Sequence, residues 1–361
     1  MGIFYKKWVR KLIDTIKIVS MINKNTYDKI SNNSIIKTAY NLSSGEIFYK
    51  IINDKLEGSY SSSLSVRVGE GAKYNFINAY YIEIEGSFHK IKRGYNSHNG
   101  FYNIVDISIQ LINLVNNCYN IKLPSIKHWF LQRVDIAICY DLEINKNVQS
   151  YINSLSLCNY PRRNLKFYQD ESIYLTGTTT TLKIYNKLLE FKKHDMKKLI
   201  DENFCLSNYL INIDGLIRFE CEIKKKKLTD FYNKKYVRIL NTNYDDFKNI
   251  WSDEFMKLLK IFDSDLMKVK SKKEVERRLK TIYPNKDDEY CMSKKASTLY
   301  NFYLSIMVDG LRNVKARTKK STYYRNIKEL KNANIDFSQN MDLDFNEIVF
   351  KFNPFEYEEV V

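Results

Sequence analysis

The sequence predicts an α+β protein, with an N-terminal antiparallel sheet covered by helices and a mainly helical C-terminal domain. Two hydrophobic periodicities in the sequence support this prediction. From residue 13 to about 235, apolar and polar residues alternate in short runs, as in strands. After about residue 236, apolar residues recur at helical spacing. We therefore expect one domain over 13–235, a helical domain over 236–340 and an acidic tail over 341–361.

Individual elements follow from the same two periods. The clearest predicted strands are 12–18, 63–68, 79–86, 132–142, 180–187 and 216–225. Helical spacing predicts helices over 105–120 and 188–203 in the first domain, and over 245–262, 272–283, 297–314 and 320–336 in the second.

The charge of the chain indicates a polyanionic partner. There are 58 Lys and Arg residues against 42 Asp and Glu, which gives a formal net charge of +16. A basic surface attracts phosphates over long range and releases counterions when it binds them, so nucleic acid is the first candidate. The alternative is compositional, because evenly spread lysine in a chain rich in Lys, Asn, Ile and Tyr can be only a solvated surface.

Cysteines and apolar runs indicate a reduced, cytoplasmic and soluble protein. The six cysteines form no C-x-x-C pair, and Cys139 and Cys221 lie within apolar runs, as in a reduced core. With four histidines and no Cys/His cluster, a structural zinc site is not expected. Asp14 and Lys17 interrupt the N-terminal apolar stretch, and no run approaches the roughly 20 apolar residues that cross a bilayer.

Three predicted strands each have one apolar face and one polar face. The two-residue period places these residues on the polar faces: Arg133 and Asp135; Lys183, Tyr185 and Lys187; Arg218, Glu220 and Glu222. If the strands share one sheet, the carboxylates of Asp135, Glu220 and Glu222 converge, and converging carboxylates favour a hard divalent cation such as Mg²⁺ or Mn²⁺.

A divalent ion beside a tyrosine is typical of phosphoryl transfer, with the phenol oxygen of Tyr185 as nucleophile. Free tyrosine has a pKa of about 10, so Lys183, Lys187 or the metal would have to favour the phenolate. The alternative is structural, because acid–base pairs across a sheet face are ordinary cross-strand partners and most strand tyrosines serve packing.

Linear motifs carry a family resemblance. The segments are "LEGSYSSSLSVRV", "IEIEGSFHKIKRGYN", "WFLQRVDIAICYDL", "YLTGTTTTLKIYNKLLE" and "LIRFECEIKKKKL". In order and spacing they resemble the filamentous-phage gene II/X family of phage and plasmid replication proteins. More distantly, the pattern is similar to staphylococcal rolling-circle plasmid initiators. "STYYRNIKELKNANID" resembles a C-terminal segment of the same family, whereas the residues before Asp14 have no counterpart.

The resemblance implies a rolling-circle nuclease-like fold and a site-specific DNA endonuclease. A tyrosine would cut one strand at a replication origin, keep the 5′ phosphate and free a 3′-OH for a polymerase, and the same site would later rejoin the strand. Carried over to this sequence, Tyr185 is the nucleophile. The strand faces described above add Lys183, Lys187 and Arg218 as its catalytic neighbours. Asp135, Glu220 and Glu222 are the expected ligands of Mg²⁺ or Mn²⁺.

One departure concerns the metal motif. Rolling-circle nucleases typically carry a His-hydrophobic-His motif, which this chain lacks. His89 is the nearest candidate for a metal or phosphate contact, although a lone His beside a turn is commonly only solvated. Lys90, Arg93 and Asn96 are candidates for contacts with DNA phosphates or bases.

The C-terminal domain offers a helix-turn-helix-like pair. Helices over 298–312 and 322–333 flank the basic segment 315–320. Tyr323, Tyr324, Arg325 and Lys328 fall where a DNA-reading helix places its contacts. The alternative is an ordinary amphipathic helix that packs Tyr324 and Ile327 inward. On this basis 236–340 is a DNA-binding or accessory domain, and 13–235 is the nicking and joining domain.

The predicted function is therefore a metal-dependent tyrosine DNA nickase and strand transferase that initiates rolling-circle replication. Its partner would be origin DNA, single-stranded or supercoiled, with a host helicase and polymerase acting next. A tyrosine recombinase is disfavoured because its Arg/His constellation is not apparent. A non-catalytic origin- or operator-binding regulator with a degenerate nuclease fold is the alternative. The sequence leaves open whether the active form is a homodimer.

Overall fold

The computed structural model describes residues 9–40, 43, 47–57, 63–70, 79–96, 100–156, 160–168, 170–196, 206–265, 272–286, 288, 291–333 and 335. These residues form two compact units, one within 1–148 and 162–255 and the other within 149–161 and 256–356. The boundary between the two units follows Phe255, inside the helix over 244–265, and so lies later in the chain than the change of hydrophobic periodicity near residue 236. The reason is that the first half of this helix packs on the sheet. The predicted acidic tail 341–361 lies outside the described residues.

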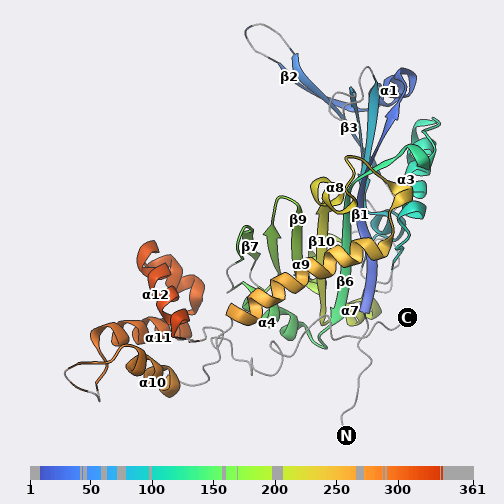
Figure 1. The fold of residues 1–361 in the computed structure, drawn as a ribbon. Helices are drawn as coiled ribbons and strands as arrows, with labels where there is room; N and C mark the ends of the chain where they lie inside the picture. The colour runs from blue at the N-terminus through green and yellow to red at the C-terminus, as the bar shows by residue number, and fades with distance from the viewer. Residues whose placement is uncertain are drawn as a thin grey trace. The chain divides into compact units, whose positions relative to one another are not determined.

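The first unit is built on one antiparallel sheet of 11 strands (Figure 1). Its spatial order is β2-β3-β4-β5-β1-β6-β10-β9-β8-β7, and β11 also pairs with β6. The strands are β1 (Val9–Ile22), β2 (Ile35–Tyr40), β3 (Ile47–Glu57), β4 (Ser63–Glu70), β5 (Tyr80–Gly86), β6 (Phe130–Asp141), β7 (Asn164–Tyr168), β8 (Ser172–Thr176), β9 (Thr180–Asn186), β10 (Leu216–Lys224) and β11 (Val237–Arg238). The predicted α+β fold with an antiparallel sheet is confirmed, and all six predicted strands belong to this sheet.

Helices follow or connect the strands. They are α1 (Lys24–Ser31), α2 (Phe88–Arg93), α3 (Ile104–Tyr119), α4 (Asn145–Leu155), α5 (Lys187–His194), α7 (Leu206–Ile213), α8 (Lys225–Tyr232), α9 (Tyr244–Asp265), α10 (Lys272–Ile282), α11 (Lys294–Arg317) and α12 (Lys320–Asn332), with short 3₁₀ turns η3 (Ile126–His128) and η4 (Ile239–Asn241). Among the described residues, none of the helices combines the length and the apolar character needed to span a bilayer.

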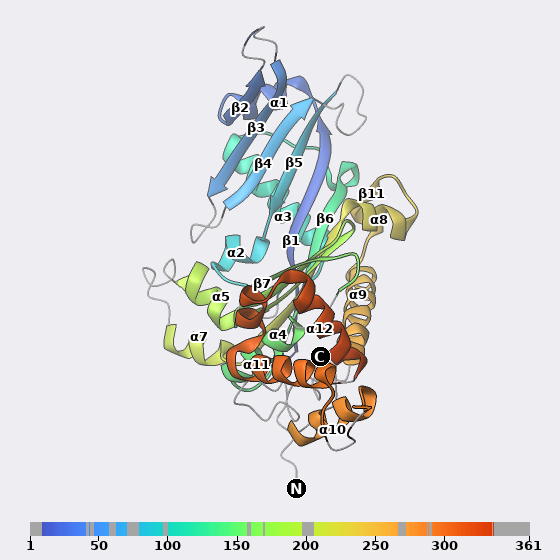
Figure 2. The ribbon, with the colours of Figure 1, turned by 90° about the vertical axis from the view of Figure 1, so that its left-hand side faces the viewer.

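Different helices cover the two faces of the sheet around β10. Helix α9 crosses one face (Figure 1), where Phe219 of β10 packs against Trp251 and Phe255, with ring centroids 6.5 and 5.2 Å away. The indole nitrogen of Trp251 donates a hydrogen bond to the Phe219 carbonyl, 3.1 Å away, which anchors the helix to the strand. Helices α2, α5 and α7 lie on the other side (Figure 2). The strand therefore has an apolar face under α9 and a second face free for polar residues.

The second unit contains α10, α11 and α12 around its own apolar core. Tyr323 of α12 is buried there and packs edge-on against Phe302, with ring centroids 5.9 Å apart, whereas Tyr324 is half exposed. Helix α11 runs to Arg317 and α12 begins at Lys320, so the predicted basic turn over 315–320 is wrong. Lys315 and Arg317 instead form the last helical turn of α11, where basic side chains complement the helix dipole.

A candidate tyrosine–carboxylate site on the central strands

Strand register brings the predicted site residues together. Strands β6, β10 and β9 are adjacent in the sheet, and their pairing places Asp135 opposite Glu222, Lys183 opposite Glu220, and Tyr185 opposite Arg218. Directly opposed residues in neighbouring strands point to the same face. The polar faces predicted from the two-residue period therefore form one continuous polar patch, on the face opposite Phe219.

The end of β9 fixes Tyr185 in this patch. The β-branched run before it favours a strand, and Asn186 then caps α5, its side-chain oxygen accepting a hydrogen bond from the Leu189 amide at 3.2 Å. Tyr185 is consequently the last residue on the polar face of β9 before the chain turns into α5.

The hydroxyl of Tyr185 is buried and hydrogen-bonded. It donates to Glu220 Oε2 at 2.8 Å, and the whole residue is only 7% exposed. Burial raises the pKa of Tyr185 well above its usual value, against the opposing charge of Arg218. The polar face predicted from the sequence is therefore buried at Tyr185. The expectation that neighbouring lysines favour the phenolate is not met in this conformation. The proximity of Tyr185 to Glu220 agrees with the strand register.

Lys183 lies where the sequence predicts a metal ion. Its ammonium nitrogen is 2.7 Å from Glu220, 3.6 Å from Asp135 and 3.7 Å from Glu222. Burial acts to lower the pKa of Lys183, but the charges of Glu220 and Asp135 and the hydrogen bond to Glu220 together outweigh it and raise the pKa. The protein therefore supplies its own cation to the three carboxylates. Among the described residues, no set of three or more His, Cys, Asp or Glu side chains is arranged to hold a metal ion. As arranged here, the predicted ligand set does not fit Mg²⁺ or Mn²⁺.

Arg133 closes the same cluster from the β1 side. It donates two hydrogen bonds to Asp135, at 2.7 and 2.5 Å, and lies 3.4 Å from Glu222. It also bonds Glu85 of β5 at 3.0 Å. Burial raises the pKa of Asp135 to about 7, against the hydrogen bonds from Arg133 and the charge of Lys183. The cations that Asp135 contacts are thus side chains of the protein itself, Arg133 and Lys183.

Arg218 connects Tyr185 to an acidic residue that the sequence analysis missed. The guanidinium is fully buried, lies 5.7 Å from the centre of the Tyr185 ring, and pairs with Asp14 at 3.3 Å and Glu220 at 3.6 Å. Burial acts to raise the pKa of Asp14, but the charges of Arg218 and Lys90 and a hydrogen bond from Asn96 outweigh it and lower the pKa. Asp14 is therefore ionised and belongs to the site.

A second polar cluster covers the tyrosine. Asn96 donates to Asp14 at 2.6 Å, accepts from the Lys187 ammonium at 2.7 Å, and accepts from Arg218 through its backbone carbonyl at 2.9 Å. Lys187 is fully buried and pairs with Glu190 one turn later in α5. Lys187 therefore supports the cover over the site, and Asn96, which we expected to contact DNA, is bonded to the protein.

The α2 segment holds its other predicted residues in internal contacts as well. His89 is 2% exposed, and its Nε2 accepts the Phe101 amide at 3.1 Å. Burial lowers the pKa of His89, which keeps the ring neutral. The predicted metal or phosphate contact of His89 is thus not supported by its geometry. Lys90 pairs with Glu190 and Asp195, at 3.2 and 3.1 Å, and the half-buried Arg93 lies 5.6 Å from the Phe101 ring.

The four C-terminal candidates divide by exposure, with Tyr323 buried and the other three exposed. Arg325 and Lys328 are exposed on α12, where they remain candidates for DNA contacts. Tyr323 is 7% exposed and belongs to the core of the helical unit, so a direct contact with a base is not available to it in this packing. Helix α12 turns Tyr323, Asn326 and Leu330 inward, with Ile327 packed against the same core. Tyr324, which the alternative interpretation placed inside, is exposed.

A comparison of the sequence with known families decides the family. Residues 14–248 match the family model described as replication-associated protein G2P, N-terminal. The chain belongs to this family. The matched region begins at Asp14, the acidic partner of Arg218, and contains the whole polar patch. Membership places the protein in DNA replication and implies that it binds DNA.

The other comparisons add less. No curated protein matches the chain. Among solved structures, the chain is similar to a rolling circle replication initiator protein from Geobacillus stearothermophilus, at 11% identity and a TM-score of 0.28. That match covers 62% of this chain and 78% of the other. We base the family assignment on the sequence match alone.

Glu190, which pairs with Lys187 and Lys90 beside the site, should make the free energy of unfolding depend on pH. Burial acts to raise its pKa, but the charges of Lys187 and Lys90 outweigh it and lower the pKa to about 2. A carboxylate with a lowered pKa stabilises the fold above its unfolded-state pKa and loses this effect as the pH falls through its folded-state pKa. Glu190→Gln should therefore reduce the free energy of unfolding by on the order of 2 kcal/mol at pH 7. The difference from wild type should shrink between about pH 4.5 and 2.

Urea unfolding at a series of pH values measures this difference. Glu171→Gln is the matched control, because Glu171 pairs with Lys193 at 3.1 Å on the surface, where the Lys193 side chain is 57% exposed. Exposed pairs contribute between about 0 and 1 kcal/mol, so this control should change stability little at any pH. Equal effects of the two substitutions would contradict the role given to Glu190.

Proposed function

We propose that this replication protein nicks and rejoins one strand of DNA at a replication origin, with Tyr185 as the nucleophile. The observation that carries the proposal is the hydrogen bond from the Tyr185 hydroxyl to Glu220, 2.8 Å long. A nucleophile bonded to an ionised carboxylate that is itself oriented by other groups is the general arrangement of covalent catalysis. Membership of a replication-associated family supplies the substrate class.

Each neighbour has a role in this proposal. Glu220 accepts the phenolic proton. Burial acts to raise the pKa of Glu220, but the charges of Lys183 and Arg218 and the hydrogen bond from Lys183 together outweigh it and lower the pKa, which keeps Glu220 ionised. The phenol oxygen forms a bond to phosphorus and the bond to the 3′ oxygen breaks, which leaves a 5′-phosphotyrosyl linkage and a 3′ oxygen that takes up a proton from solvent. Arg218 and Lys183 stabilise the negative charge that develops on the phosphate. Attack by the freed 3′ oxygen reverses the step and joins the strand.

Access to Tyr185 requires the cover to move. Asn96 and Lys187 bond across the site, and Tyr185 is only 7% exposed. Displacement of Asn96 would remove three hydrogen bonds at once, to Asp14, Lys187 and Arg218. In the proposed mechanism, DNA binding opens this segment and the scissile phosphate takes its place beside Arg218.

Dependence on Mg²⁺ or Mn²⁺ remains a prediction of the sequence. The carboxylates of Asp135, Glu220 and Glu222 already surround the Lys183 ammonium. We therefore assign no step to a metal ion in this arrangement. The roles of a host helicase, a polymerase and a second copy of the chain are proposals of the same kind.

The burial of Tyr185 favours a second candidate, an origin- or operator-binding regulator without catalysis. In that case the polar patch would serve only as a buried charge network that fixes the sheet. Both candidates require DNA binding, and only the first requires a reaction at Tyr185.

A single assay separates the two candidates. The protein is incubated with supercoiled DNA of its own element and with Mg²⁺, with Mn²⁺, or with EDTA, and the products are separated under denaturing conditions. Nicked circles that carry covalent protein, with the DNA attached to the peptide that contains Tyr185, are the result we expect. Binding of the same DNA with no nicked circles under any of the three conditions would favour the regulator.

A further inference from the structure

The polar face that carries Tyr185 continues across β8 to β7, the last strand of the sheet. Strand pairing places two rows of directly opposed residues on this face. The first row is Arg218, Tyr185, Ser172 and Tyr168, and the second row is Glu220, Lys183, Tyr174 and Lys166. Tyr168 and Lys166 therefore lie in the same rows as the proposed nucleophile and its lysine neighbour, two strands away.

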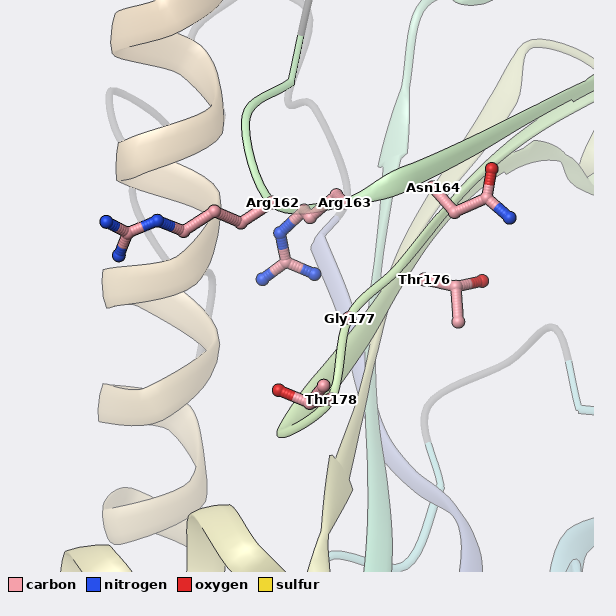
Figure 3. Close-up of a pocket in the computed structure, with 6 residues that line it drawn as sticks. All are labelled: Arg162, Arg163, Asn164, Thr176, Gly177 and Thr178. Atoms are coloured by element: carbon pink, nitrogen blue, oxygen red, sulfur yellow. The ribbon is translucent and has the colours of Figure 1, made fainter.

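The next row along the strands shows which side of the sheet this face occupies. Asn164 of β7 is paired with Thr176 of β8, and Figure 3 shows both side chains extending to the same side of the two strands. Arg163, one residue before Asn164, extends to the other side and pairs with Glu254 of α9 at 2.5 Å. The face that Asn164 shares with the later residues of β7 is therefore turned away from α9, as it is at Tyr185.

Exposure increases along this face from the central strands to the sheet edge. Tyr185 is 7% exposed, the Lys183 side chain 18% and Tyr168 49%. Tyr174 is half-buried and Lys166 is exposed. The face is thus closed over the proposed nucleophile and open at β7. A ligand that approaches from the sheet edge meets Tyr168 and Lys166 first.

The open end of the face combines aromatic rings with positive charge. The rings of Tyr168 and Tyr174 pack edge to face, with centroids 5.8 Å apart and an interplanar angle of 87°. The Lys166 ammonium forms no hydrogen bond or ion pair with a described residue. None of the residues that β7, β8 and β9 place on this face is acidic. Glu171, in the turn before β8, is already paired with Lys193 at 3.1 Å.

This combination indicates single-stranded DNA as the partner. Proteins bind unpaired strands through aromatic side chains on which bases stack and through basic side chains that follow the phosphates. The contact with Tyr174 orients the Tyr168 ring before any ligand binds, which lowers the entropic cost of stacking. Bases in a duplex are already paired and stacked on one another, so an exposed tyrosine ring offers them no comparable contact.

The strand spacing relates this surface to the proposed reaction. Strand β7 is two strands from β9, a distance of roughly 10 Å at about 4.8 Å per strand. That is the length of about three nucleotides at about 3.4 Å each. We infer that the β7–β8 surface binds the DNA strand to be cut, with a base stacked on Tyr168 and a phosphate on Lys166, within about three nucleotides of the scissile phosphate. The identity of this strand rests on the proposed function.

Anisotropy of fluorescein-labelled single strands tests the stacking contact. The two probes are an oligothymidylate of about 12 nucleotides and a strand with the same number of phosphates but without bases. All variants carry Tyr185→Phe, so that covalent attachment cannot contribute. Tyr168→Ala should weaken binding of the oligothymidylate about tenfold, a typical loss for one stacked base, and should leave binding of the abasic strand unchanged. Tyr168→Phe keeps the ring and should bind both strands as the parent does.

Lys166→Ala tests the phosphate contact separately. The phosphates are the same in both probes, so the variant should weaken binding of both by the same factor. It should also reduce the slope of log K against log salt by about 0.7, which corresponds to one phosphate on a single strand. A larger loss on the oligothymidylate than on the abasic strand would contradict the role given to Lys166.

Tyr102→Ala is the matched control for Tyr168→Ala. Tyr102 is 63% exposed and lies outside β7, β8 and β9, so its removal should change binding less than twofold. Unchanged affinity of Tyr168→Ala, an equal loss on the abasic strand, or an equal loss in Tyr102→Ala would each overturn the inference. Normal binding by Tyr168→Ala together with a changed sedimentation mass would also overturn it, because the surface would then be a contact between protein chains.

The binding results and the adduct assay fail independently. None of the binding measurements depends on nicking, so DNA binding with the expected Tyr168 dependence and no adduct would contradict only the proposed reaction. Normal adduct formation with unchanged binding by Tyr168→Ala would contradict only the role of the β7–β8 surface.

Discussion

Replacement of Tyr185 by phenylalanine should abolish the covalent protein–DNA adduct, with a loss of at least about 10³-fold in nicking rate. The reason is local, because the hydroxyl that phenylalanine lacks is the group bonded to Glu220. The ring itself keeps its place over Arg218, so the variant should fold and bind origin DNA as wild type does. Loss of one hydrogen bond to a charged group should reduce the free energy of unfolding by about 1 to 2 kcal/mol. Adduct formation on supercoiled DNA, scored on denaturing gels, measures the first effect.

Tyr174→Phe is the matched control for this experiment. Tyr174 lies on the neighbouring strand β8, directly opposite Lys183, and is therefore the adjacent tyrosine on the same face. It should form the adduct at close to the wild-type rate. An adduct that persists in Tyr185→Phe and disappears in Tyr174→Phe would reassign the nucleophile, and an adduct that persists in both would remove the patch from the proposed reaction.

The strand period was sufficient to predict which residues meet. Asp135, Lys183 and Glu220 lie on different strands. Alternation placed each on the polar face of its strand, because successive side chains of a strand point to opposite faces of the sheet. The sheet and the six strongest strands were predictable for the same reason. The role of each residue in chemistry stays a prediction, since geometry establishes contact and not reaction.

The cover of the site could not be predicted in this way. Lys187 follows the strand pattern in sequence, but it is the first residue of α5, so its contacts are set by the helix. Asn96 reaches the site from the segment after α2, and nothing in its local sequence indicates that it meets Arg218. Asp14 was visible only as a charge in an apolar run, and its position between Ile13 and Ile16, where the β1–β6 register shifts, is a property of the folded sheet.

Burial was missed because it depends on those same long-range contacts. A charged face is usually solvated. Here Asp135 is nearly inaccessible and pairs with Arg133 and Lys183. Arg218 is fully buried, pairs with Asp14 and donates to the Asn96 carbonyl in the segment after α2. Single strands carry no information about what will cover them. The polar patch therefore reads in sequence as a surface and in the structure as an interior.

Because Arg218 is fully buried in this polar patch, we expect its replacement to have a large effect on the stability of the protein. Arg218→Met should reduce the free energy of unfolding by about 3 to 5 kcal/mol, because it removes a fully buried charge and leaves the largely buried carboxylate of Asp14 without its arginine partner. Methionine has a similar length, so the loss reflects charge and hydrogen bonding more than a cavity. Urea unfolding of the purified variant, followed by tryptophan fluorescence, measures it.

A double-mutant cycle with Asp14→Asn identifies the cause. If Arg218→Met destabilises the protein because it leaves the charge of Asp14 without its arginine partner, Asp14→Asn should restore part of the free energy of unfolding in the double variant. The coupling energy between the two substitutions should then be between about 1 and 3 kcal/mol. The asparagine can still meet the Asn96 side chain, so the cover over Tyr185 stays in place. A coupling energy near zero would show that the two residues act independently. In that case Arg218 would owe its burial to Tyr185 and the Asn96 carbonyl, which lies 2.9 Å from its guanidinium.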